Sequence, residues 1–480
     1  MTTRSFGMFI GGEAVAGGRS LEVLDKWTGA VVGHAALGSA EELEQAIAAA
    51  VGAEPEMAGL AIHRRRDALL GLADGIGSRR DEFAEMLRAE AGKPITAARG
   101  EVERTIVTIR SAAGEAERLG GEVLALDTEA RSEGYVGMVK RVPVGACSFI
   151  TPFNFPLNLV AHKIAPAIAC GCPFVLKPAE RTPLTALMIG EELAKLGLPA
   201  GSWSILALDV GDAGPLVGDD RFKLLSFTGS QTVGWALKAK AGKKKVALEL
   251  GGNAACVVDE SADVDDAAER IVVGGYGYSG QSCISVQRVL VHESRYDELR
   301  EAMVGRVSEL AHGDTRDAET VVGPLIDEAA AARVEAWIEE ARAGGASVLC
   351  GGTREATAGG ARSLVRGAVL AGVAPDARLA CDEVFGPVTV LERFGSFDEA
   401  LERVNDSDFG LQAGVFTRDI GRSHAAWDRL RVGAVLINEI PSWRVDPMPY
   451  GGVKDSGLGR EGPRYAIEEM TERRMMVVRG

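Results

Sequence analysis

One cysteine lies in a run of small, uncharged residues, Gly280-Gln-Ser-Cys-Ile-Ser285. Upstream, Leu248-Glu-Leu-Gly-Gly-Asn253 places one carboxylate among similarly small neighbours. A thiol nucleophile with a separate carboxylate that activates water is a recurrent catalytic combination. The pattern indicates Cys283 as a nucleophile and Glu249 as a base. The alternative is a buried structural cysteine, which is favoured for any cysteine considered alone.

A third segment has the chemistry of a phosphate site. Phe227-Thr-Gly-Ser-Gln-Thr-Val-Gly234 follows an apolar run and precedes a helical pattern. The N–H groups around Gly229 and Ser230 would then face a pyrophosphate at a helix N-terminus. No Gly-x-Gly-x-x-Gly fingerprint opens the first strand–helix unit, and a glycine–serine turn before a helix is also a common cap.

The segments that must position these residues alternate between helix and strand. Residues 39–120 have helical periodicity, and Ser39 with Glu42 resembles a capping box. From Lys140 onward the pattern predicts parallel strand–helix units and therefore open sheets, which bind ligands at the carboxyl ends of their strands. The predicted strands are 142–150, 173–177, 204–208, 224–227, 256–258, 288–291, 347–350, 388–391 and 433–438, and the main predicted helices after Lys140 are 159–169, 184–196, 264–275, 299–310 and 329–343.

Composition narrows the class of protein. A chain of 480 residues exceeds one hydrophobic core, so two or three domains are expected. The net charge of −15 argues against a nucleic-acid surface and against binding to an anionic membrane. The uncharged segment 142–161 is long enough to span a bilayer, but its three prolines and two asparagines argue for a buried strand and a loop.

The cysteines indicate the compartment. There are seven, without any Cys-x-x-Cys pair, which fits free thiols in a reducing, cytoplasmic environment. Cys170-Gly-Cys172 has the wrong spacing for zinc, so we predict no metal site.

Taken together, the motifs resemble those of the aldehyde dehydrogenase superfamily. They occur in the same order as in that superfamily and extend over most of the chain. The motifs are Thr151-Pro-Phe-Asn-Phe-Pro156, Lys177-Pro-Ala-Glu180, Phe227-Thr-Gly-Ser230, Leu248-Glu-Leu-Gly-Gly-Asn253, Gly280-Gln-Ser-Cys283, Glu383-Val-Phe-Gly-Pro387 and Pro449-Tyr-Gly-Gly-Val-Lys454.

The resemblance implies a role for each matching residue. Cys283 would form a thiohemiacetal and then a thioester, and Glu249 would activate the water that hydrolyses it. Asn154 and the Cys283 N–H would stabilise the oxyanion. The implied cofactor residues are Thr151, Pro152, Lys177, Glu180, Gly229, Ser230, Glu383 and Phe385, with Lys177 and Glu180 on the adenine-side ribose and Glu383 and Phe385 beside the nicotinamide.

Because a carboxylate at Glu180 would repel a 2′-phosphate, NAD is expected in preference to NADP. Phe155, Ser282, Arg104 and Arg444 are the implied substrate residues. Two arginines favour a small aldehyde with an anionic or hydroxylated end. Alternatively, Arg104 pairs with Glu101 or Glu103, and Arg444 pairs with Asp446.

Within the superfamily, the local sequence motifs most resemble those of the lactaldehyde and non-phosphorylating glyceraldehyde-3-phosphate dehydrogenase-like branch. Ala161-His-Lys-Ile-Ala-Pro166, Ser282-Cys-Ile-Ser-Val-Gln287 and Trp443-Arg-Val-Asp446 carry this similarity. Ser282 stands where several relatives acting on phosphorylated aldehydes have arginine, which argues against a phosphate ester.

The implied fold is α/β and aldehyde dehydrogenase-like, with two Rossmann-like open-sheet domains and a small β oligomerisation arm. We expect an NAD-binding domain at 1–120 and 140–248, a catalytic domain at 249–433, and an arm at 121–139 and 434–480. The arm would make a homodimer or a homotetramer.

Three other readings stay open at this stage. A CoA-acylating aldehyde dehydrogenase typically lacks the base, so Glu249 favours hydrolysis. A catalytically silent relative with a structural role is disfavoured by the intact Cys283, Asn154 and Glu249. A thiol hydrolase would need a histidine partner, and none of the six histidines lies in a matching motif.

Overall fold

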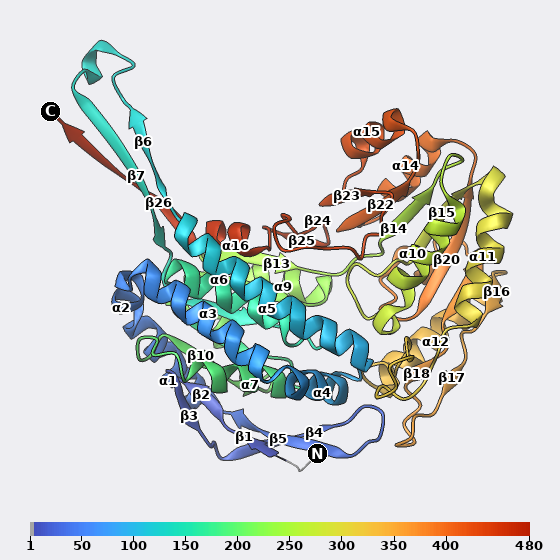
Figure 1. The fold of residues 1–480 in the computed structure, drawn as a ribbon, viewed down its shortest axis with the longest axis horizontal. Helices are drawn as coiled ribbons and strands as arrows, with labels where there is room; N and C mark the ends of the chain where they lie inside the picture. The colour runs from blue at the N-terminus through green and yellow to red at the C-terminus, as the bar shows by residue number, and fades with distance from the viewer. Residues whose placement is uncertain (1–3) are drawn as a thin grey trace.

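A computed structural model describes residues 4–480 as two α/β domains with a narrow projecting arm (Figure 1). The two domains confirm the predicted α/β class with two open sheets. Among residues 4–480, no helix is long and apolar enough to cross a bilayer.

The first domain is built on an eight-stranded sheet. Its five central strands are parallel, and its outer strands β25, β2 and β3 run antiparallel to their neighbours. In order the strands are β25 (Gly457–Leu458), β13 (Lys245–Glu249), β12 (Leu224–Thr228), β8 (Cys147–Ile150), β9 (Phe174–Lys177), β10 (Trp203–Ile205), β2 (Met8–Ile10) and β3 (Glu13–Val15).

The amino-terminal strands were not predicted from the sequence. Their short apolar runs lack a clear period-two pattern. Three of them form a second, smaller sheet with β11 (Ala207–Leu208), which lies within the predicted strand 204–208. That strand prediction is wrong, because its residues are divided between two sheets. The other members of the smaller sheet are β1 (Arg4–Phe6), β4 (Arg19–Leu24) and β5 (Val31–Gly38).

The helical prediction for residues 39–120 is confirmed. Ser39 and Glu42 form the expected capping box at the first helix. Gly92, in the left-handed conformation with φ 66°, ends α4 immediately before Lys93 and Pro94. The helices are α1 (Ala40–Gly52), α2 (Glu54–Gly59), α3 (Ile62–Ser78), α4 (Arg80–Ala91) and α5 (Ile95–Arg118).

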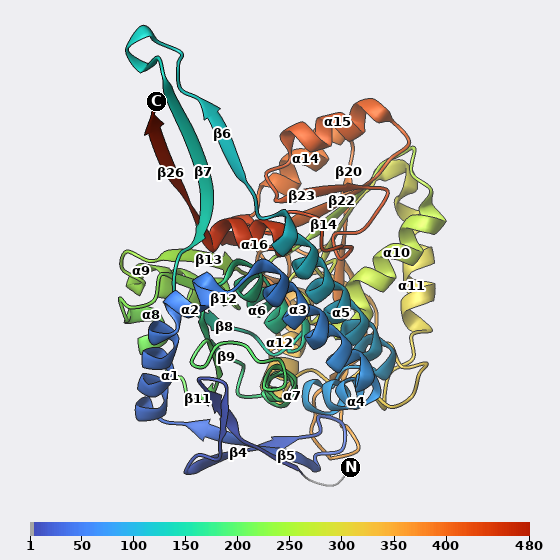
Figure 2. The ribbon, with the colours of Figure 1, turned by 60° about the vertical axis from the view of Figure 1, so that its left-hand side comes forward.

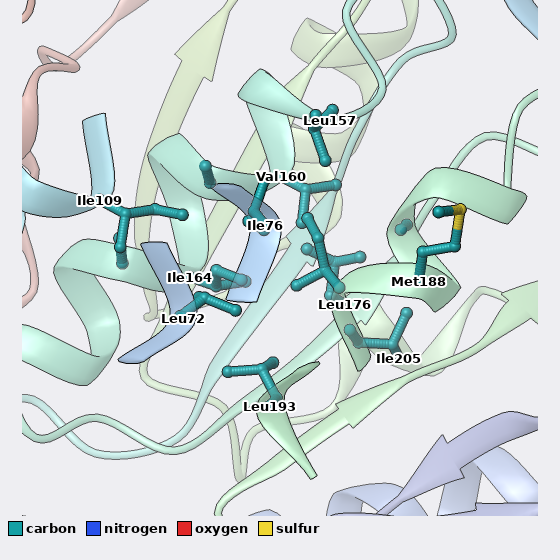
Figure 3. Packing of buried hydrophobic residues seen from close by; sticks show 14 of the residues in the cluster. Leu72, Ile76, Ile109, Leu157, Val160, Ile164, Leu176, Met188, Leu193 and Ile205 are labelled. Carbon is teal, nitrogen blue, oxygen red and sulfur yellow. The ribbon is translucent and has the colours of Figure 1, made fainter. Parts of the chain in front are cut away.

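The core of this domain surrounds α6 (Asn158–Cys170), which lies between the helical layer and the sheet (Figure 3). Ile164 of α6 faces Leu72 of α3, and Leu176 of β9 lies close to Val160. Because α6 is buried on all sides, even Lys163 is inside, where its Nζ donates to Ser226 Oγ at 2.8 Å. The helix α7 (Leu184–Leu193) also packs into this core, where it contacts α3 and α4.

The second domain has a seven-stranded sheet in which only β16 runs antiparallel to its neighbour. The order is β16 (Ser347–Cys350), β19 (Ala368–Ala371), β20 (Val388–Phe394), β15 (Arg288–His292), β14 (Ala255–Val258), β22 (Gln412–Phe416) and β23 (Ala434–Ile437). The helices α10 (Val264–Tyr276), α11 (Tyr296–Ser308), α12 (Glu328–Ala343), α14 (Phe397–Asn405) and α15 (Ile420–Arg429) cover it.

Two further predicted boundaries are wrong. The segment 142–150 is not one strand, because Pro143 and the left-handed Gly145 separate β7 from β8, which lie in different sheets. Most of 434–480 is not arm, since β23 completes the second domain's sheet and β25 adds to the first. The arm is a three-stranded sheet of β6 (Gly121–Ala125), β7 (Tyr135–Pro143) and β26 (Thr471–Arg479), and it projects from the body in both views (Figures 1 and 2).

Candidate active site

A pocket of about 570 Å³ is lined by side chains from both domains. It brings together nearly all the residues that the sequence singled out. Those lining it are Arg104, Pro152, Asn154, Phe155, Gly229, Ser230, Glu249, Ser282, Cys283, Glu383, Phe385 and Arg444. Thr151, Lys177 and Glu180 lie outside this lining, beside it at the ends of β8 and β9.

The turn before Cys283 has an unusual backbone. Tyr278, Ser279 and Gly280 have φ values of 50°, 58° and 69°, which is the left-handed region. Side chains other than glycine occupy this region at a cost of about 1–3 kcal/mol each. Two hydrogen bonds hold the turn, from Tyr278 Oη to Ala91 O at 3.1 Å and from Ser279 Oγ to Gly323 O at 2.8 Å. The nucleophile is therefore placed by contacts to the first domain as well as its own.

The Cys283 sulfur has one hydrogen-bond partner among the described residues. Its Sγ lies 2.9 Å from Tyr450 Oη. Removal from water raises the pKa of the Cys283 thiol to about 12, while the hydrogen bond with Tyr450 and the charge of Arg444 act in the opposite direction. A thiolate in this pocket therefore depends on nearby donors and cations.

Asn154 lies in a turn bounded by Pro152 and Pro156, and its side chain is buried. Its Nδ2 donates to Gln281 O at 3.0 Å, directly beside the nucleophile turn. The amide nitrogen carries a second N–H. Within residues 4–480, the Cys283 backbone N–H has no hydrogen-bond acceptor. Both donors are thus free to meet an oxyanion formed beside Cys283 Sγ.

A buried ion pair fixes the Asn154 turn. Lys93 Nζ pairs with Glu101 Oε2, and both side chains are almost completely shielded from solvent. The other oxygen of Glu101 accepts hydrogen bonds from the N–H groups of Leu157 and Asn158, each at 3.1 Å. Lys93 Nζ also lies 3.8 Å from the ring centroid of Phe155. One pair therefore orients both the amide and the aromatic wall of the pocket.

Glu249 ends β13, and its carboxyl is buried with neither oxygen hydrogen-bonded to any residue of the described chain. Burial raises the pKa of Glu249 well above its usual range, and the negative charge of Glu461 raises it further. Arg444, Lys163 and Arg460 act in the opposite direction. A carboxyl with free oxygens and a raised pKa is suited to take a proton from water near neutral pH.

The two arginines differ in how they are held. Arg444 Nη2 forms a buried ion pair with Glu461 Oε2 at 3.0 Å, whereas Arg104 makes no ion pair within residues 4–480. The alternative pairings considered from the sequence are wrong. Glu101 pairs with Lys93 and Glu103 with Arg80, while Asp446 accepts a bond from Thr108. Arg104 thus leaves one uncompensated guanidinium in the pocket.

Two groups in the pocket fit the nicotinamide end of a dinucleotide. Glu383 is partly buried in the pocket, where loss of hydration raises its pKa to about 7, and its Oε1 accepts a hydrogen bond from Gly252 N at 3.1 Å. Phe385 packs edge-on against Phe153 with centroids 5.8 Å apart. A Cβ at Gly229 would lie 2.5 Å from the Phe227 ring, so a side chain at this position would crowd the end of β12, whereas glycine leaves room for a ligand to approach the backbone.

The remaining expected cofactor residues lie at strand and helix ends. Ser230 precedes α9 (Gln231–Lys240) and makes no side-chain cap, which leaves the first N–H groups of that helix for an anion. Lys177 Nζ pairs with Glu180 Oε1 at 2.7 Å at the end of β9. Thr151 N donates to Lys177 O, so the two strand ends are coupled. The residues present therefore fit a dinucleotide.

Sequence reasoning missed four residues of this site. Tyr450 lies in a motif that supported the resemblance, but no role was assigned to it. Glu461 has no local signal, because its partner Arg444 lies 17 residues before it. Lys93 and Glu101 are close in sequence, but the N–H groups that Glu101 accepts belong to a remote segment. The Arg444–Glu461 interaction would have required knowing that Tyr450 and Glu461 face each other in an antiparallel bridge.

Comparisons with known proteins agree with this geometry. The family model described as "Aldehyde dehydrogenase family" matches residues 14–476. The 3-sulfolactaldehyde dehydrogenase of Priestia aryabhattai is 40% identical over 476 residues, covering 99% of this chain and 98% of that protein.

Solved structures are similar over the whole chain. The aldehyde dehydrogenase 21 of Physcomitrella patens, in complex with the reaction product succinate, has a TM-score of 0.97 and 44% identity, covering 100% of this chain and 99% of its own. The NADP-dependent glyceraldehyde-3-phosphate dehydrogenase of Bacillus halodurans C-125, complexed with NADP, has a TM-score of 0.95 and 35% identity, covering 99% of both chains.

The electrostatics of Glu249 are testable without any substrate. In an infrared titration, the carboxylic acid band that disappears in Glu249→Gln should persist well above the usual pH range of a glutamate, because burial and Glu461 disfavour its charge. In Glu461→Gln the band should be lost at lower pH, since a like charge has been removed.

The surface variant Glu468→Gln, on the same helix that follows Glu461, serves as the control and should leave the band unchanged. Loss of the Glu249 band in the usual range in both the native protein and Glu461→Gln would contradict this assignment.

Proposed function

The chain belongs to the aldehyde dehydrogenase family, and we propose that it oxidises a small aldehyde to the carboxylic acid with a nicotinamide dinucleotide, through a covalent intermediate on Cys283. One observation carries the proposal. The Cys283 thiol, the Asn154 amide and the Glu249 carboxyl, which come from separate parts of the chain, line one pocket.

In the first half-reaction, the Cys283 thiolate forms a carbon–sulfur bond to the aldehyde carbon. The carbonyl oxygen becomes an oxyanion, which the free N–H of Asn154 and the Cys283 N–H stabilise by hydrogen bonds. A nicotinamide dinucleotide, when bound, supplies the hydride acceptor for the oxidation. Loss of hydride from the former aldehyde carbon leaves a thioester on Cys283.

In the second half-reaction, Glu249 takes a proton from a water molecule as that water attacks the thioester carbon. The carbon–sulfur bond breaks, the acid leaves, and the sulfur is again a thiolate. The unpaired oxygens of Glu249 support this role, because a carboxyl already engaged in hydrogen bonds would be a poorer acceptor. A base in this position favours hydrolysis over acyl transfer to a thiol such as CoA.

The two half-reactions predict separable variants. Glu249→Gln should release about one reduced cofactor per active site in a rapid burst, followed by slow turnover, because acylation does not need the base. Cys283→Ala should show neither burst nor turnover. Stopped-flow fluorescence of the reduced cofactor measures both phases. Wild-type steady-state turnover in Glu249→Gln would show that another group activates the water.

We further propose that the substrate is a short aldehyde with an anionic or hydroxylated end. Among the described residues Arg104 has no ion-pair partner, and Arg444 pairs with Glu461. The two guanidinium groups therefore give the pocket a local positive charge within a chain of net charge −15. Two relatives support this, since one is named for 3-sulfolactaldehyde and the other was solved with succinate. Ser282 leaves room beside Cys283 and adds a hydroxyl donor.

Arg104→Ala should raise KM for an anionic aldehyde by about 10- to 100-fold, the value of one charge-assisted hydrogen bond, and leave a neutral aldehyde of equal size nearly unchanged. Steady-state kinetics with both aldehydes measure the difference. Arg110→Ala is the matched control, because Arg110 lies on the same helix but pairs with Asp74 at the surface. A native preference for the neutral aldehyde would exclude the anion site.

NAD is proposed as the preferred cofactor, although relatives solved with NADP belong to the same family. The Lys177–Glu180 pair supports NAD, because the carboxylate accepts bonds from ribose hydroxyls but repels a 2′-phosphate. The ratio of kcat/KM for NAD to that for NADP should exceed one in the native enzyme. It should fall by about tenfold or more in Glu180→Ser. Equal values for both cofactors in the native enzyme would contradict this.

The arm is proposed to join copies of this chain into a homodimer or homotetramer. Its strands leave apolar side chains uncovered, among them Val123, Met475, Met476, Val477 and Val478. Replacing both Met476 and Val478 by lysine should shift sedimentation toward the monomer, because charge would have to be buried in the interface. Val210→Lys, on an exposed part of the first domain, should not. An unchanged assembly in the arm variant would exclude this role.

All seven cysteines carry free thiols in the structure. This supports a reducing compartment, and we propose the cytoplasm as the site of action.

A further inference from the structure

The contact between Tyr450 and Cys283 has no role in the reaction outlined above. The Tyr450 ring is buried, and its backbone is held by two hydrogen bonds with Glu461, one of 3.0 Å from Tyr450 N and one of 2.6 Å to Tyr450 O. The guanidinium of Arg444 lies over the ring, 3.7 Å from its centroid. Because Arg444 is itself paired with Glu461, the three side chains form one rigid unit beside the nucleophile.

The direction of the hydrogen bond follows from the charge states. A thiolate can only accept, whereas a phenol hydroxyl can donate. Burial raises the pKa of Tyr450 well above its usual range, so the phenol keeps its proton when the sulfur loses its own. A cation against the ring face draws electron density from the phenol and makes its O–H a stronger donor. Arg444 thus acts on Cys283 partly through Tyr450.

We propose, building on the proposed function, that Tyr450 is a catalytic residue whose hydroxyl donates a hydrogen bond to the Cys283 thiolate and stabilises it before aldehyde attack. Among the described residues, no other side chain is hydrogen-bonded to this sulfur. The pocket reduces the hydration of this partly buried sulfur, so the donor supplies stabilisation that water would otherwise give. When the sulfur bonds to carbon, its charge moves to the carbonyl oxygen and the Tyr450 bond weakens.

This role has a kinetic signature that a packing defect does not share. Removing a donor to a charged acceptor should raise the thiol pKa by about 1 to 2 units. The remaining thiolate should then be more nucleophilic, because intrinsic reactivity rises with pKa with a Brønsted slope of about 0.4–0.5. Below the thiol pKa these effects combine to slow alkylation by about 3- to 10-fold, while the rate per thiolate increases.

The test uses Tyr450→Phe in the full chain, which keeps the ring and its contact with Arg444. Iodoacetamide labelling of Cys283 is followed by mass spectrometry across a pH series, with no aldehyde or cofactor present. The thiolate fraction is measured by its ultraviolet absorbance relative to Cys283→Ala. The exposed Cys381 is the reference thiol within each sample. Tyr276→Phe removes a buried phenol hydroxyl outside the pocket and is the matched control.

The expected result is slower labelling of Cys283 in Tyr450→Phe, a higher thiol pKa and a faster rate per thiolate, with Cys381 and the Tyr276→Phe protein unchanged. Faster labelling near neutral pH would mean that Tyr450 restrains the thiol, and an unchanged pKa would mean that it only packs. Either outcome overturns the proposal. Because no aldehyde is used, failure of the native enzyme to oxidise any aldehyde would refute the proposed function without affecting this measurement.

Discussion

The buried pair of Lys93 and Glu101 is the interaction on which the site depends most. Glu101 receives the N–H groups that open α6, and Lys93 lies against the faces of both Phe155 and Tyr278. Phe155 belongs to the turn of the first domain, and Tyr278 belongs to the nucleophile turn of the second. Breaking such a pair leaves an uncompensated buried charge, at a cost of about 3–5 kcal/mol. The Lys93 ammonium group therefore helps to position one aromatic side chain in each wall of the pocket.

Local patterns were sufficient for the main elements and for the reacting groups. The Ser39 capping box, the helical period of residues 39–120 and the alternating strands each depend on neighbours in sequence, and the structure confirms them. The arm boundary was wrong because β23 is an edge strand whose partner, β22, cannot be inferred from its own composition. Which apolar strand joins which sheet is decided by long-range pairing.

The site residues that the sequence did not reveal were missed for the same reason, because long-range contacts decide their roles. Tyr450, Glu461 and Arg444 act together only because an antiparallel bridge and a buried ion pair bring them face to face. Glu461 compensates Arg444 and at the same time disfavours the charged form of Glu249. One carboxylate thus weakens an anion site and strengthens a base, and neither effect can be read from the residue types alone.

The left-handed run at Tyr278, Ser279 and Gly280 bears on more than geometry. Such a turn is not favoured by the chain alone, and its hydrogen bonds to Ala91 and Gly323 exist only when the surrounding segments are packed. In a partly folded or separated molecule, the cysteine would relax to an ordinary peptide conformation without Asn154 or Tyr450 beside it. Catalysis is thereby conditional on docking, because the sulfur meets the donors that stabilise its charge only after the surrounding segments have packed together.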